Sequence, residues 1–107
     1  MRRFKMIVFT NPVENREEEY NQWYTSRHIH EVLTVPGIVS GQRFRFRNGN
    51  DRWGYVALYD LETDHPESII PEIRKRTGDG TFLVSDAISY DGLYSGIFEP
   101  ITEVVTR

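Results

Sequence analysis

The fold is decided by the stretch Tyr20-Asn-Gln-Trp-Tyr-Thr-Ser-Arg-His28-Ile-His-Glu-Val-Leu33 and by the Val35-Pro36-Gly37 that follows it. Its first tyrosine, Trp23 and Tyr24 stand at the i, i+3 and i+4 spacing of one helix face. The same spacing next reaches charged residues, so we expect the helix to break near His28. A short second turn should follow, and the Pro-Gly pair should end it.

Runs of β-forming residues surround this helix and predict the remaining elements. An Asn-Gly pair between two such runs is a strong hairpin signal. A weaker helical pattern follows the hairpin, and an apolar, β-rich region comes last. The expected order is a strand at 3–10, a helix at 15–28, hairpin strands at 37–47 and 52–61, a helix at 64–77 and a last strand region at 93–106.

This β-α-β-β-α-β order predicts an α+β fold, the ferredoxin-like plait, as one domain over residues 1–107. Its four-stranded antiparallel sheet carries both helices on one face. The other face is then bare. A second copy packed face to face would cover it and would form a dimeric α/β barrel that encloses a cavity.

The side chains expected on the bare face depend on the register of the hairpin. An even-length loop between Arg47 and Arg52 pairs Phe44 with Tyr55, and it places Ser40 opposite another tyrosine. Alternation along the strands then gathers five aromatic residues on the bare face, namely Phe44, Phe46, Trp53, Tyr55 and Tyr59.

Composition excludes several classes of function. The formal net charge is -3 and no basic run is longer than Arg2-Arg3, which argues against a nucleic-acid partner. No apolar run is long enough to span a membrane. Without cysteine there is no disulfide, thiolate metal site or thiol nucleophile, and we expect a cytoplasmic protein.

His28 is the leading candidate for catalysis, because histidine titrates near neutral pH and can move a proton without a cofactor. Tyr24 precedes it by four residues and Glu31 follows it by three, so both can reach the ring. Each has a structural alternative. The histidine can be a core or capping residue, the tyrosine can pack between helix and sheet, and the glutamate can pair with Arg27.

Residues on the bare face are candidates for substrate binding. Aromatic walls with a few polar groups suit a flat apolar ligand, although dimer packing is an equal alternative. Trp23 is a further candidate, with a place in the core as its alternative. Arg43 is expected to face the helix layer. The predicted substrate-binding set is Trp23, Gln42, Phe44, Tyr55 and Tyr59.

No metal site is expected. His28 and Glu31 share a helix face, but a third ligand is missing nearby. His30 points elsewhere on the helix, and His65 or Asp86 would have to come from far along the chain. A haem ligated by His28 remains an alternative with no other support in the sequence.

One part of the chain resembles a known family. Trp23-Tyr24-x-x-x-His28-Ile-x-Glu31-Val-Leu-x-Val35-Pro36-Gly37 and then Gln42-Arg43-Phe44 are similar to the EthD-like branch of the dimeric α/β-barrel superfamily. The match runs over about residues 11–46, with a looser one at 94–102. Such sequences often have proline at the position of His30, so this chain departs from the pattern there.

The resemblance implies a small homodimeric enzyme, and the histidine adds acid/base chemistry to that expectation. We expect a cofactor-independent cyclase, isomerase, dehydratase or lyase acting on an aromatic, polyketide-like or lactone molecule. The alternatives are a cofactor-free or haem-linked monooxygenase of the same superfamily and a non-catalytic accessory protein that binds a small molecule. Because the superfamily holds many activities, the fold does not select among them.

Overall fold

Four antiparallel strands form one sheet in the computed structural model, which describes residues 1–107. Their order across the sheet is β2-β3-β1-β4. The strands are β1 (Arg2–Pro12), β2 (Ile38–Arg45), β3 (Tyr55–Thr63) and β4 (Ile88–Phe98). No helix in the chain has the length and apolar character that crossing a membrane requires.

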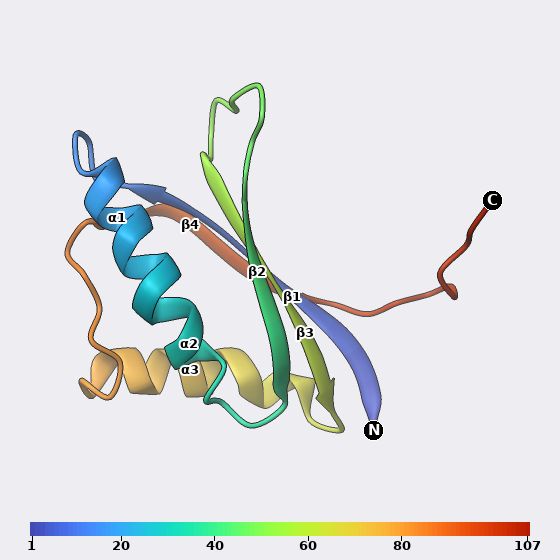
Figure 1. The fold of residues 1–107 in the computed structure, drawn as a ribbon. Coiled ribbons are helices and arrows are strands. Elements are labelled where there is room, and N and C mark those ends of the chain that lie inside the picture. The colour runs from blue at the N-terminus through green and yellow to red at the C-terminus, as the bar shows by residue number, and fades with distance from the viewer.

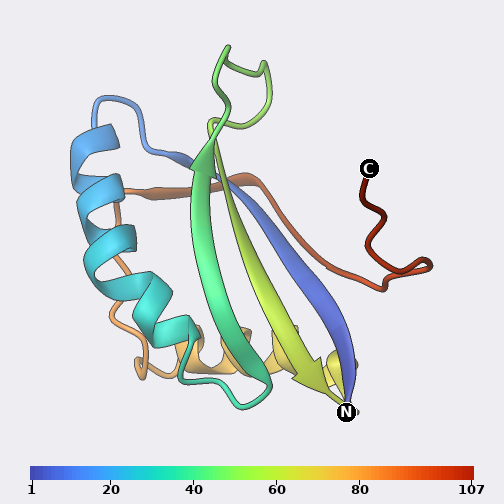
Figure 2. The ribbon, with the colours of Figure 1, turned by 45° about the vertical axis from the view of Figure 1, so that its right-hand side comes forward.

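Both helical segments lie on the same face of this sheet, and the C-terminal segment leaves toward the opposite side (Figures 1 and 2). The predicted ferredoxin-like fold is therefore confirmed for the chain. The helical segments are α1 (Glu17–Trp23), η1 (Tyr24–His28) and α2 (Ile29–Val32) in the first crossover, and η2 (Pro66–Ser68) and α3 (Ile69–Gly78) in the second.

The sequence predicted a break in the first helix near His28. Instead, the helix of the first crossover continues through this residue. A π-helical turn, η1, joins α1 to α2, so the helix continues with one wider turn. A π turn inserts an extra residue without releasing the backbone from hydrogen bonding, and such turns are frequent at functional sites. Asn15 does not cap the helix, because it lies before it with φ of 66°.

The predicted hairpin register is wrong by one residue. Phe44 pairs with Val56 rather than with Tyr55, because the loop between Phe46 and Gly54 has an odd number of residues. Hydrogen bonds to side chains determine the length of this loop. The amide oxygen of Asn50 accepts hydrogen bonds from the backbone N–H groups of residues 52 and 53, both at 2.9 Å, so these residues close the loop instead of extending the strand.

The shift exchanges the two faces of β3. Tyr55 and Tyr59 face the helices and are buried there with Phe4, Met6, Ala57 and Leu61, instead of lining the bare face. Gly41 lies opposite Tyr59, and a Cβ added there would come within 2.8 Å of the tyrosine ring. Glycine is therefore required where the ring crosses β2.

The bare face has its own aromatic group. The ring of Phe9 stacks on that of Trp53 at a centroid distance of 4.6 Å, and Phe46 and Tyr94 pack around it. Phe44 and Tyr94 keep 41% and 48% of their surface exposed. The expectation of an open aromatic face thus holds, but with partly different residues.

Candidate functional site

His28 is held in a box of aromatic rings on the helix side of the sheet. Its imidazole stacks on Trp23 with ring centroids 4.6 Å apart and a 19° angle. Tyr24 lies nearly perpendicular to it with centroids 4.8 Å apart, and Phe82, from the segment between α3 and β4, closes the box at 6.0 Å. The π turn that ends at His28 directs the ring into this box.

Glu31 holds His28 from one turn further along the helix. Its Oε1 lies 3.4 Å from Nδ1 of the histidine, and its Oε2 lies 3.6 Å from Nε of Arg27. Both alternatives raised by the sequence, the contact with His28 and the pair with Arg27, therefore occur together. A carboxylate on Nδ1 favours the tautomer that carries its proton there, which leaves Nε2 as the basic nitrogen.

Two side chains of the same helical run bind the backbone of Leu83, one at its N–H and one at its carbonyl. The N–H of Leu83 donates to Oε2 of Glu31 at 2.8 Å, and the indole N–H of Trp23 donates to the carbonyl of Leu83 at 2.9 Å. This clamp of Trp23, Glu31 and Leu83 fixes Phe82, the neighbouring residue, against His28. No sequence pattern indicates this clamp, because Glu31 and Leu83 lie 52 residues apart in the chain.

Burial lowers the pKa of His28 below its ordinary value of 6.5, while the hydrogen bond and charge of Glu31 oppose this change and the charge of Arg43 adds to it. The neutral imidazole therefore predominates at neutral pH. Nε2 has no hydrogen-bond partner, yet no buried side-chain nitrogen in the chain lacks one, so Nε2 retains access to solvent. The ring thus offers an accessible base with a fixed orientation.

Tyr24 connects the histidine to a second group of buried polar residues. Its hydroxyl lies 3.3 Å from that of Tyr59, and burial raises the pKa of Tyr59 to about 12. Burial also holds the pKa of Tyr24 well above its ordinary value, so both phenols keep their protons. The guanidinium of Arg43 lies over the Tyr24 ring, 4.4 Å from its centroid, on the helix side where the sequence placed it.

The predicted substrate-binding residues do not form one group. Trp23 joins the histidine box, and Tyr55 and Tyr59 lie beneath the helices. Gln42 and Phe44 lie on the bare face of the sheet, opposite Leu58 and Val56. The residues that share the box with His28 are therefore Trp23, Tyr24, Glu31 and Phe82.

The remaining histidines lie apart from the box. His30 is exposed on α2, and His65 is exposed before η2, where its ring nitrogen lies 3.7 Å from Glu67. No three His, Cys, Asp or Glu side chains lie near enough to one another to hold a metal ion.

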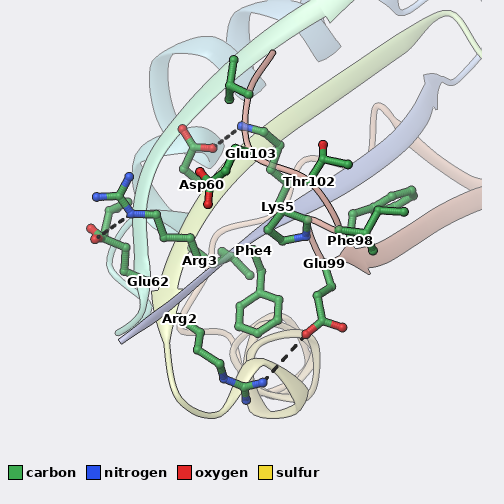
Figure 3. A pocket seen from close by; sticks show the side chains of 15 residues that line it. Arg2, Arg3, Phe4, Lys5, Asp60, Glu62, Phe98, Glu99, Thr102 and Glu103 are labelled. Carbon is green, nitrogen blue, oxygen red and sulfur yellow. Dashed lines mark hydrogen bonds and ion pairs between the residues drawn. The ribbon is translucent and has the colours of Figure 1, made fainter.

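A hollow lies elsewhere, between the sheet and the C-terminal segment (Figure 3). It has a volume of about 1210 Å³ and contains no histidine. Its basic residues are paired with acids: Arg2 with Glu99, Arg3 with Glu62 and Lys5 with Asp60. Because these charges are already matched, we place the candidate site at His28 rather than in the hollow.

No protein-family model matches the sequence. A curated relative, core atranone cluster protein 1 of Stachybotrys chlorohalonatus, is 34% identical over 61 residues, which cover 53% of this chain. The match spans about a quarter of that relative's length.

Solved structures match the whole chain. The haem degrader MhuD of Mycobacterium tuberculosis has a TM-score of 0.67 at 16% identity, covering 95% of this chain and 99% of its own. An EthD-like protein of Ralstonia eutropha JMP134 has a TM-score of 0.59 at 11% identity, and the match covers 100% of both chains. A dimeric ferredoxin-like protein of Jannaschia sp. CCS1 has a TM-score of 0.57 at 13% identity, and the match covers 92% of this chain and 99% of its own. These likenesses confirm the fold that the resemblance to the EthD-like branch implied.

The comparison with MhuD corrects the expectation of no cofactor. That protein has two haems bound in its active site, on a fold that matches 95% of this chain. The expectation rested on the absence of a haem signal in the sequence. The expectation of no cofactor was therefore wrong, because the absence of a haem signal in the sequence does not exclude haem from a chain of this fold.

The pKa of His28 tests the geometry of the site. We expect it to lie below 6.5 and to fall further in Glu31→Gln, because the negative charge of Glu31 favours the protonated ring. Titration of ¹³C-labelled histidine by NMR measures it, with the resonance assigned by its loss in His28→Gln. A pKa that stays the same or rises in Glu31→Gln would contradict the arrangement.

The lowered pKa of His28 also predicts that the free energy of unfolding depends on pH. Since the folded-state pKa lies below that of the unfolded chain, the unfolded chain binds more protons in the interval between the two values. The contribution of His28 to the free energy of unfolding is therefore lost as the pH falls through that interval. Urea denaturation at several pH values should show this loss in the parent protein, and His28→Gln should remove it.

Proposed function

We propose that the protein is an enzyme that moves a proton on a small apolar or aromatic molecule, with His28 as the general acid and base. The observation that supports this most is the pairing of Nδ1 with Glu31 while Nε2 has no partner. This is the arrangement of an oriented catalytic histidine. The substrate would carry a carbonyl group beside an acidic C–H bond.

The proposed step uses the neutral ring. Nε2 takes the proton from the carbon beside the carbonyl, and the electron pair of the C–H bond moves into the enolate. The imidazolium that forms is stabilised by the carboxylate of Glu31, and it then returns the proton to carbon or oxygen. Cyclisation, isomerisation and lyase reactions of polyketide-like or lactone molecules all include such a step.

The neighbouring rings have positioning roles in this proposal. Trp23 restrains the imidazole by stacking on its face, and Tyr24 packs against it at a nearly perpendicular angle. Tyr24 keeps its proton because burial raises its pKa, so it does not compete with His28 as a base. Phe82 and Trp23 give the box an apolar wall that suits an aromatic ligand.

Exchange of a carbon-bound hydrogen tests the step without knowledge of the natural substrate. With 2-tetralone in D₂O, the protein should accelerate loss of the α-proton signal in the NMR spectrum. His28→Gln should reduce this acceleration by about 10²-fold or more, the usual contribution of a general base. Glu31→Gln should reduce it less, because the ring stays in place.

His30→Gln is the matched control, since His30 is exposed and lies outside the box. Its exchange rate should equal that of the parent protein. Equal rates in the parent and His28→Gln would contradict the assignment. Binding of 2-tetralone without any exchange would instead favour a non-catalytic protein that binds small molecules.

A second candidate is a haem-linked protein, and the donor chemistry of His28 favours it. A histidine that binds a metal through one ring nitrogen commonly donates the N–H of the other to a carboxylate. Nδ1 of His28 faces Glu31 in this way. His28 would be the residue that holds the haem iron, with Glu31 orienting its ring. Haem would supply redox chemistry when bound.

Titration with haemin separates this candidate from the first. Axial ligation by His28 should shift and sharpen the Soret band, and His28→Ala should weaken binding by about tenfold or more. His30→Ala should leave the spectrum unchanged. An identical Soret spectrum in the parent protein and His28→Ala would contradict ligation by this residue.

We also propose that two copies pack through the bare faces of their sheets. Exposed aromatic side chains on that face and the nearly fully exposed Ile101, Val104 and Val105 beyond it support this. The Jannaschia neighbour is described as dimeric. Light scattering should give twice the chain mass, and Phe44→Asp should weaken the dimer by about tenfold or more. Leu83→Asp, an exposed apolar residue on the helix side, is the control and should leave the dimer intact.

A further inference from the structure

Arg43 is the one arginine of β2 that is held rigidly. Its Nη1 donates to Oγ1 of Thr25 at 2.8 Å and to the carbonyl of Asn21 at 3.4 Å, while Nη2 donates to Oδ1 of Asn21 at 2.8 Å. The guanidinium also lies over the rings of Tyr20, Tyr24 and Tyr55, with 4.4 to 5.5 Å between its carbon and the ring centroids. These contacts fix its plane.

The bonds leave a defined pair of donors free. A guanidinium has five N–H groups, of which Nη1 uses two and Nη2 uses one. Asn21 accepts from both terminal nitrogens, so it occupies the end of the guanidinium between them. The free donors of Arg43 are therefore N–H of Nε and the second N–H of Nη2, which point the same way and match the two oxygens of a carboxylate.

No carboxylate of the chain takes this position. Arg43 forms no ion pair, whereas five other arginines of the chain do. Its three acceptors are neutral, and tyrosine faces compensate a cation only in part. Arg43 is half-buried, and its Nε has no partner although no buried side-chain nitrogen of the chain lacks one, so Nε retains some solvent exposure.

We propose that Arg43 binds the carboxylate of a small-molecule ligand through its Nε and Nη2 groups. The inference rests on the proposed function and names its substrate class as carboxylated aromatic or apolar molecules. Tyr24 contacts both Arg43 and His28, so the proposed anion site and the proposed base share one neighbouring ring.

Benzoate and benzamide, which differ in charge and not in shape, are the probes. Benzoate should shift the Nε–H signal of Arg43 in a ¹⁵N–¹H spectrum, and the parent protein should bind it at least about tenfold more tightly than benzamide. Arg43→Lys keeps the charge and the stacking but loses the paired donors, and Arg43→Gln loses both. Each variant should bind benzoate about tenfold more weakly than the parent.

Arg45→Gln is the matched control, because Arg45 lies two residues along the same strand and forms no ion pair. It should bind benzoate like the parent protein. His28→Gln should also keep benzoate affinity while it loses proton exchange, so the two proposals fail separately. Equal affinity for benzoate and benzamide, or unchanged benzoate affinity in a folded Arg43→Lys, would overturn the inference.

Discussion

The register between β2 and β3 is the constraint on which the rest of the structure depends. Side chains on a strand alternate between faces, so a shift of one residue exchanges the whole set. The side chains of Asn50 and Asn11 hold the chain near Gly54 in the loop and set this register. As a result, Tyr55 and Tyr59 pack beneath the helices, and phenylalanine and tryptophan side chains remain on the bare face.

The buried tyrosines make the helix side of the sheet unusually polar for a core. Tyr20 bonds to Thr10, Tyr24 to Tyr59, and Tyr55 to both Asn21 and Glu17. Each hydroxyl has a partner, so burial costs little beyond desolvation. This layer provides fixed hydrogen bonds next to the histidine box, where a fully apolar core would provide only packing.

Much of the architecture could be predicted from the sequence, because hydrophobic periodicity and the Asn-Gly turn are local signals. The grouping of Tyr24, His28 and Glu31 was predictable for the same reason, since helical spacing brings them together. The register was not, because it depends on hydrogen bonds that Asn50 and Asn11 accept from the loop backbone and that no periodicity reveals. The contacts of Phe82 and Leu83 with the helix were also beyond prediction, since they join segments far apart in the chain.

The clamp of Trp23, Glu31 and Leu83 has a consequence for how this chain can vary. It binds the backbone of Leu83, while the side chain of that residue is 56% exposed. Substitutions at that position therefore leave the attachment intact. An inserted or deleted residue between α3 and Leu83 would instead move Phe82 away from His28. Related chains that keep the histidine box should accordingly conserve the length of this connection more strictly than its composition.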